Sequence, residues 1–193
     1  MDELSLYVLD ITMNSVRAGA TDICITLTED GEWLTFRVED NGCGMSKEQL
    51  THLTDPFFTT RKTRKVGLGV PFLKMLAEMT GGYVTVKSVP ESESNEHGTV
   101  IEAKFNKNHI DFIPLGDIVA TVETLIQGAP DIDFTFLHIF PHGSIELSCK
   151  TIREVLGDGV KLCEPDVLQW IRGYLTEQYD DIKYGFAQPQ AAH

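Results

Sequence analysis

The order of its periodic segments constrains the fold of this 193-residue chain more than any other feature. Residues 3–18 predict a helix, with Leu6, Leu9, Met13 and Val16 at helical spacing, and alternating residues at 22–28 and 33–39 predict two strands. A short helix at 46–51 with Ser46 as its cap, a helix at 70–80 and two strands at 83–89 and 98–105 follow. This order predicts an α/β (α+β) two-layer sandwich, with helices on one face of a mixed, mostly antiparallel sheet.

A change of composition near 106–114 divides the chain into two expected domains, 1–106 and 107–193. In the second, we predict a helix at 115–128, a hairpin formed by DFTFLHIF and SIELSCK, helices near 151–157 and 164–178, and a frayed end at 180–193. His138 and His142 are expected to be ordinary strand-end residues at this hairpin. We interpret 107–193 as a small α/β accessory or interaction domain.

Composition excludes several classes of function. The chain has 16 basic and 29 acidic residues, a formal net charge of −13, which opposes binding to a nucleic-acid backbone. It has no apolar run near the roughly 18 residues that cross a bilayer, and its first residues are acidic, unlike a secretory signal. Its four cysteines lack zinc-site or disulfide-framework spacing. We therefore expect a cytoplasmic protein that binds neither membrane nor nucleic acid.

Three segments carry residues suited to chemistry. The first helix has a polar stripe of Glu3, Asp10, Asn14 and Arg17, whose amide oxygen is a possible Mg²⁺ ligand and whose guanidinium suits phosphate. The second segment, DNGCG at 40–44, follows a strand, and its glycines allow a flat ligand to approach the backbone. In the third, four basic residues within 61–65 lead to GLG at 67–69, where a helix start exposes free N–H groups to an anion. A polar helix face, a structural turn and a solvated loop are the alternative interpretations.

Taken together and in this order, the three segments resemble the ATP-binding domain of the GHKL superfamily, with its Bergerat fold. Gyrase-type topoisomerases, large heat-shock chaperones, sensor histidine kinases and mismatch-repair ATPases share this domain. The resemblance covers roughly residues 1–106, and the chain has no Walker-type phosphate loop. It implies that Asn14 ligates Mg²⁺, that Arg17 faces the phosphates, and that Asp40 pairs with the adenine amino group.

The same resemblance assigns roles to the glycines and to the irregular stretch. Gly42 and Gly44 would shape the adenine pocket, and Thr99 would support adenine through Asp40 or a water. The stretch 52–66 resembles a flexible ATP lid that begins with an F box. The remaining nucleotide contacts it implies are Phe58, Thr60 and Lys62 in the lid, and Gly67, Leu68 and Gly69 at the helix start.

The sequences of these motifs resemble two different branches of the superfamily. NSVRAGATDICIT and DNGCGM resemble mismatch-repair ATPases, whereas PFFTTRKTRKVGLGVPFLK resembles sensor histidine kinases. The short lid and the acidic charge favour the second branch. Its members place a phosphoacceptor histidine upstream of the ATP domain, but the 13 residues before Asn14 contain none. Any phosphotransfer is therefore expected to go to a partner chain, as in anti-sigma serine kinases, and we expect that partner at the lid or at 107–193.

Asp10 decides whether the chain turns ATP over. Hydrolysing members carry a Glu one helical turn before the Asn, and a carboxylate there acts as general base when it reaches the attacking oxygen. Asp is one methylene shorter, so Asp10 is either this base or an orienter of Mg²⁺-bound waters. The sequence thus predicts an Mg·ATP-binding ATPase or protein kinase. The alternatives are an ATP-gated binding module without turnover and a mismatch-repair-like ATPase.

Overall fold

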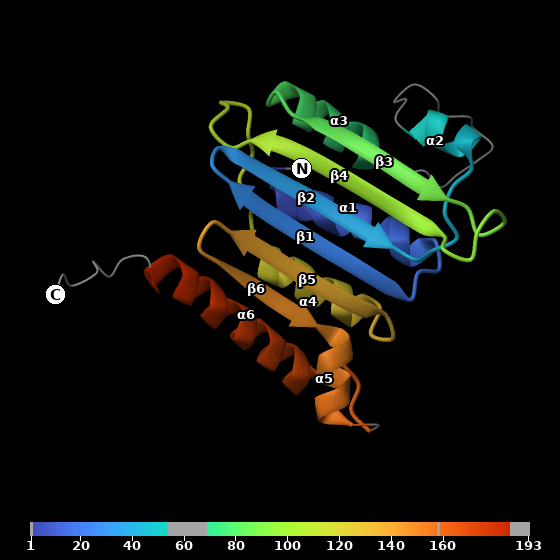
Figure 1. Ribbon diagram of the computed structural model, residues 1–193. Coiled ribbons are helices and arrows are strands. Elements are labelled where there is room, and N and C mark those ends of the chain that lie inside the picture. Colours follow the sequence, from blue (N-terminus) through green and yellow to red (C-terminus); the bar gives the residue numbers. More distant parts are fainter. Residues whose placement is uncertain (1, 54–68, 158, 186–193) are drawn as a thin grey trace.

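The computed structural model describes residues 2–53, 69–157 and 159–185. The elements in these ranges are α1 (Leu4–Arg17), β1 (Asp22–Asp30), β2 (Trp33–Asp40), α2 (Lys47–Leu53), α3 (Gly69–Met79), β3 (Tyr83–Val89), β4 (Gly98–Asn106), α4 (Ile118–Gly128), β5 (Asp133–Phe140), β6 (Gly143–Ser148), α5 (Cys149–Leu156) and α6 (Pro165–Gly185). The described strands make one sheet in the order β3-β4-β2-β1-β5-β6 (Figure 1). Only the β1–β5 pair among them is parallel, which confirms the mixed, mostly antiparallel sheet.

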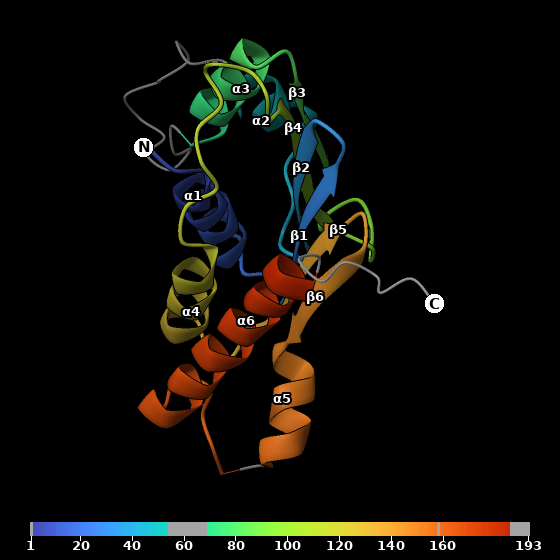
Figure 2. The same ribbon diagram turned by 90° about the vertical axis from the view of Figure 1, so that its left-hand side faces the viewer.

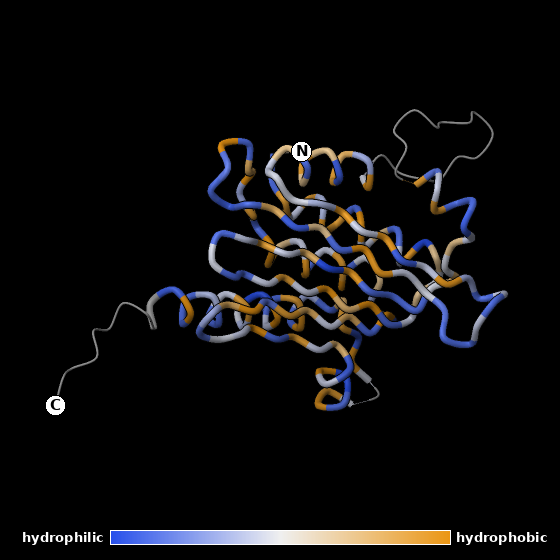
Figure 3. Tube along the Cα trace, turned by 45° about the horizontal axis from the view of Figure 1, so that its top comes forward, coloured by the Kyte–Doolittle hydropathy of each residue, from blue (hydrophilic) through white to orange (hydrophobic). Residues whose placement is uncertain are grey.

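The sheet has one apolar and one polar face. Figure 2 shows α1, α3, α4 and α6 on the same side of the strands. Figure 3 shows polar and apolar residues following one another along the strands, as expected where one face is buried. The side chains that face the helices include Ile23, Ile25, Leu27, Leu34, Phe36, Val38, Ala103, Phe105, Phe134 and Phe136. On the other face Arg37 lies 2.8 Å from Glu39 and 3.7 Å from Glu102. The predicted two-layer sandwich is confirmed.

The buried face of α1 differs from the predicted one. Leu4, Val8 and Ile11 are fully buried, whereas Leu6 is 41% exposed. The core face also contains Ser5, Thr12 and Ser15, each almost completely buried. Small hydroxyl residues do not contribute to a pattern of large apolar side chains, so the sequence periodicity indicated a neighbouring face of the helix.

Three helix boundaries are also corrected, each by a local interaction. Helix α4 begins at Ile118 instead of 115, because the Asp117 side chain accepts a hydrogen bond from Ala120 N (2.8 Å) and caps it. Helix α5 begins at Cys149, because Ser148 caps it by accepting from Thr151 N. Helix α6 continues to Gly185 beyond the predicted end at 178, and Ile182 packs against the core. None of the helices in the described ranges is both long and apolar enough to cross a bilayer.

His138 is a buried part of the core and not an ordinary strand-end residue. It follows Phe134 and Phe136 on the inward face of β5 and is 1% exposed. Its Nδ1 lies 2.8 Å from Tyr179 Oη on α6, and its Nε2 lies 3.5 Å from Glu29 Oε1 on β1. The second Glu29 oxygen lies 2.7 Å from Lys107 Nζ. The hydrogen bond with His138 and the charge of Lys107, acting against burial, lower the pKa of Glu29 to about 2.

The sheet continues across the boundary predicted near 106–114. Strand β5 pairs with β1 from Asp22 opposite Asp133 to Thr28 opposite Ile139, and β6 pairs with β5. Buried residues from both sides of the boundary form one hydrophobic cluster. The division into domains 1–106 and 107–193 stays a prediction, and it becomes the question of whether residues 1–106 fold without β5.

Candidate functional site

The polar stripe of α1 separates into two parts in the structure. Arg17 Nη1 donates a hydrogen bond to Asn14 Oδ1 (3.1 Å), and both side chains lie at the C-terminal half of the helix. Glu3, at the other end, lies against Gly116. Asn14 and Arg17 are therefore in contact, Glu3 belongs to a different contact, and the grouping of Asp10 with Asn14 and Arg17 stays a prediction.

Asp10 lies at the start of α3. A Cβ built on Gly69, the first residue of α3, would overlap Asp10 Oδ2, so the carboxylate is packed against the glycine backbone. A helix N-terminus favours a negative group, because its free N–H groups and its dipole both present positive charge. The structure thus brings together Asp10 and Gly69 from segments that are almost 60 positions apart. Phe58, Thr60, Lys62, Gly67 and Leu68 lie outside the described residues.

Asp40, at the end of β2, is held by two donors. Ser15 Oγ on α1 donates to Asp40 Oδ2 (2.5 Å), and Gly42 N donates to Oδ1 (2.9 Å). Ser15 is 5% exposed. A carboxylate offers about four acceptor positions, so two remain for a further donor. The arrangement therefore fixes the direction of Asp40 without exhausting its capacity to accept hydrogen bonds.

The turn after Asp40 needs glycine at two positions. A Cβ on Gly42 would come within 2.9 Å of Ala18 Cβ, and one on Gly44 would overlap the Val89 carbonyl. Gly44 also has a φ of +66°, which disfavours other residues. The turn is tied to the end of α1, because Cys43 N donates to Ala18 O (3.0 Å). These contacts form a close-packed backbone edge beside the Asp40 carboxylate.

Thr99 lies opposite Asp40 in the β2–β4 register and is 8% exposed. Its hydroxyl lies 2.8 Å from Ser88 Oγ on β3. Ser88 in turn donates to Gly98 O (2.9 Å) and accepts from Met45 N (2.8 Å). Because the single Ser88 proton goes to Gly98, Thr99 is the donor to Ser88. The hydroxyls of Ser88 and Thr99 thus join the turn that follows Asp40 to strands β3 and β4.

Sequence reasoning missed three residues of this site. Ser15 follows Asn14 on α1 but points to the core, where only the tertiary structure brings it to Asp40. Ser88 was detectable, because hairpin register between 83–89 and 98–105 places it opposite Thr99. His97, whose Nδ1 lies 2.6 Å from Gly42 O, comes from the loop before β4 and left no signal in the periodicity.

The donor set fits one nucleotide with one hard cation. The Asn14 carboxamide oxygen is the kind of ligand that Mg²⁺ accepts when phosphates and waters supply its other positions. Asp40 with the Gly42–Gly44 backbone suits a flat ring that carries an amino group. Among the described residues no group of three or more His, Cys, Asp or Glu side chains is arranged to hold a metal. A cation here would therefore depend on ligand oxygens as well as on Asn14.

Comparison with known proteins places the chain in one family. Residues 2–109 match the family described as histidine kinase-, DNA gyrase B-, and HSP90-like ATPase. The chain is 32% identical over 89 residues to the sensor histidine kinase ZraS of Escherichia coli K12, which is 45% of this chain and 19% of that protein. It is 33% identical over 66 residues to the CAI-1 autoinducer sensor kinase/phosphatase CqsS of Vibrio cholerae, 34% of this chain and 10% of the other. The chain thus spans about a fifth or less of these relatives.

Two of the solved structures with a similar fold are the following. The N-terminal domain of a DNA repair protein has a TM-score of 0.56 and 18% identity, over 82% of this chain and 58% of the other. The Aquifex aeolicus MutL ATPase domain, complexed with ADP, has a TM-score of 0.50 and 14% identity, over 81% of this chain and 69% of the other. At such identities the likeness concerns the fold, and it confirms the Bergerat architecture. By the match over 2–109, the chain belongs to the histidine kinase-, DNA gyrase B-, and HSP90-like (GHKL) ATPase family.

Proposed function

We propose that this protein binds Mg·ATP between α1, the turn after β2 and the start of α3, and that it acts as an ATPase or as a protein kinase on a partner protein. The observation that carries the proposal is Asp40, whose carboxylate is oriented by Ser15 and Gly42 and keeps free acceptor positions. An adenine amino group is a donor that these positions accept. Gly42 and Gly44 let the ring approach the backbone. Thr99, which lies opposite Asp40 in the sheet, would support adenine through Asp40 or a water.

The phosphate end of the proposed site is at α1 and α3. Asn14 would hold Mg²⁺, which when bound neutralises phosphate charge. Arg17 donates to Asn14 Oδ1, and its guanidinium would bind a phosphate group held beside Asn14. The N–H groups of Gly67, Leu68 and Gly69 would face the phosphates, and Phe58, Thr60 and Lys62 would close over them as part of the lid at 52–66. Family membership supports these roles, which come from the resemblance of the motifs.

Asp10 is the proposed general base. Its carboxylate lies against Gly69, the first residue of α3, and by the resemblance of the motifs the γ-phosphate would lie at this end of the nucleotide. There it can accept the proton of an attacking water or partner hydroxyl. Transfer of a phosphoryl group depends mainly on positioning and electrostatic stabilisation, so a short base in a fixed place is sufficient. Sensor histidine kinases are among the relatives, which favours transfer of the phosphoryl group to a protein.

The fate of the γ-phosphate tests this proposal. Purified protein is incubated with γ-labelled Mg·ATP, and label is counted in inorganic phosphate, on the chain and on bound ATP. We expect release as phosphate, or transfer to an added partner, that falls about 10²–10⁴-fold in Asp10→Asn with ATP affinity retained. Asp30→Asn, the same change at an exposed strand end, is the matched control.

The other outcomes separate the alternatives. Label that stays on tightly bound ATP, unaffected by Asp10→Asn, indicates the ATP-gated binding module without turnover or a kinase whose partner is absent, and transfer on addition of a cell extract identifies the kinase. Label on the chain itself indicates autophosphorylation and contradicts transfer in trans. Hydrolysis that requires added DNA at low salt indicates the mismatch-repair-like ATPase. A wild-type chain that binds no ATP contradicts the proposal as a whole.

A further inference from the structure

The first turn of α1 is capped by a segment more than 100 residues away. The N-cap residue Glu3 makes no side-chain capping hydrogen bond. Instead, Leu4 N donates to Pro114 O (2.9 Å) and Ser5 N donates to Leu115 O (2.8 Å). In Figure 2 the connection from β4 to α4 passes the beginning of α1. The backbone of this connection therefore does the work that Ser, Thr, Asp or Asn side chains usually perform.

Side chains reinforce the cap. Gly116 has a φ of +77°, and a Cβ on it would overlap the side chain of Glu3. One turn into α4, Thr121 Oγ1 donates to Ser5 O (3.4 Å) and is 5% exposed. Residues 114–121, the capping segment, thus contact the first turn of α1 through both backbone and side chains.

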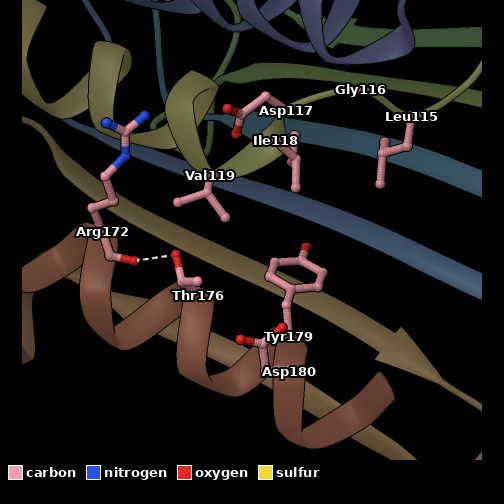
Figure 4. A pocket seen from close by; sticks show the side chains of 9 residues that line it. All are labelled: Leu115, Gly116, Asp117, Ile118, Val119, Arg172, Thr176, Tyr179 and Asp180. Carbon is pink, nitrogen blue, oxygen red and sulfur yellow. Dashed lines mark hydrogen bonds between the residues drawn. The ribbon is translucent and has the colours of Figure 1, made fainter. Parts of the chain in front are cut away.

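The opposite side of the capping segment is open. A hollow of about 390 Å³ lies between the start of α4 and α6, and Figure 4 shows Leu115 to Val119 on one wall and Arg172, Thr176, Tyr179 and Asp180 on the other. The segment is packed against α1 on one side and has free space on the other. A side chain forced between Gly116 and Glu3 would therefore displace the cap into this hollow before it disrupts the core.

Helix α1 transmits such a displacement to the proposed site. Seven residues separate Glu3 from Asp10, about 10 Å along a helix. The far end of α1 is held by Ser15 on Asp40 and by the hydrogen bond from Cys43 N to Ala18 O. A helix held at its C-terminal end and shifted at its beginning moves Asp10, five positions before Ser15, more than Asn14, which is next to Ser15.

We propose that the capping segment positions Asp10 for the phosphate end of ATP, with Gly116 as a positioning residue. The inference rests on the proposed function, since it assigns the ATP site to α1. It also gives part of 107–193 a role: this part sets the position of the N-terminal half of α1, which carries the proposed base.

Gly116→Ala tests the inference, and Gly157→Ala is a matched control. Gly157 has a similar φ of +75°, but a Cβ on it meets nothing within 4 Å, so it shares the backbone strain without the collision. Affinities for Mg·ATP and for adenosine are measured by calorimetry, together with turnover and the melting temperature. We expect Gly116→Ala to lower Mg·ATP affinity or turnover about 10–100-fold, with adenosine affinity unchanged. Glu3→Gly combined with Gly116→Ala removes all three Glu3 atoms in the collision, the Cβ included, and restores Mg·ATP binding.

The outcomes distinguish this inference from the proposed function. If wild-type protein binds Mg·ATP and Gly116→Ala behaves like Gly157→Ala, positioning by the capping segment is wrong and the ATP site stands. An equal loss of Mg·ATP and adenosine affinity also overturns it, because it indicates general destabilisation. If wild-type protein binds neither ligand, both proposals fail. Should Gly116→Ala not fold, Thr121→Val, which removes only the hydroxyl on Ser5 O, is expected to weaken Mg·ATP and not adenosine, and unchanged Mg·ATP binding contradicts the inference.

Discussion

At the scale of single residues, Asp40 gives the sharpest prediction. Replacing it with Asn turns one acceptor oxygen into a donor, which then faces Ser15 Oγ or Gly42 N, both of which donate now. The mispaired group lowers the stability of the protein, whereas the loss of the charged acceptor for the adenine amino group costs about 1–3 kcal/mol of ATP binding. We expect Asp40→Asn to lower ATP affinity by about 10–100-fold, measured by calorimetry. Asp30→Asn is expected to leave it unchanged, and equal affinities in the two variants would refute the adenine role of Asp40.

Residue types and spacing predicted the acids and glycines of the site, but not what orients them. Asp40, Gly42 and Gly44 form one short motif, so they could be found together in the sequence. Ser15 could not, because its contact with Asp40 joins a helix to the end of a strand 25 positions later. Such a pair depends on the angle at which α1 crosses the sheet, and periodicity carries no information about that angle.

At the scale of elements, the cluster around Glu29 joins β1, β5 and α6 and predicts a dependence of stability on pH. The folded pKa of Glu29, about 2, lies below its ordinary 4.5, since His138 and Lys107 favour the charged form. The carboxylate therefore stabilises the fold above about pH 4.5, and this contribution is lost as the pH falls toward 2.

We expect Glu29→Gln to lower the free energy of unfolding at pH 6 by about 1–3 kcal/mol. The difference from wild type should shrink in urea titrations as the pH falls below about 4.5 towards 3, because the Glu29 carboxylate of the unfolded wild-type chain then binds a proton while that of the folded chain does not. Glu154→Gln, at an exposed position of α5, serves as the control. A difference between Glu29→Gln and wild type that stays constant over this range argues against the ion pair as its source.

The sequence predicts which strands pair as hairpins. It does not predict which strand pairs with the other edge of β1. Strands joined by a short turn, such as β1 with β2 and β5 with β6, pair because they are neighbours in sequence. The parallel pairing of β1 with β5 joins segments about 110 positions apart. Alternation predicts that both are strands with one buried face. It does not predict that they pair, because backbone hydrogen bonds form in the same way with any strand. By the same alternation His138, two positions after Phe136, shares the buried face of β5. Because its side chain is polar, the apolar pattern did not reveal this.

At the scale of the whole molecule, the continuous sheet predicts that residues 1–106 depend on the rest of the chain. A fragment of these residues loses β5 from the edge of β1 and the cap on α1. An exposed strand edge and two newly uncapped N–H groups, those of Leu4 and Ser5, both disfavour the folded monomer. We expect the fragment to unfold at a lower urea concentration than the full chain, followed by circular dichroism and by the fluorescence of Trp33. An unchanged midpoint would instead support two independent domains.

The order in which the strands are synthesised differs from their order in the sheet. Strand β1 and the nearby turns that carry the motifs of the site are synthesised long before β5 is complete. Strand β5, which ends at Phe140, is the neighbour of β1 in the centre of the sheet. At ribosomal rates of about 5–20 residues per second, the 34 residues from Asn106 to Phe140 require roughly 2–7 s. For that interval the nascent chain has an open strand edge in the middle of its future sheet, so the speed of translation over this stretch influences how much of the protein reaches its native state.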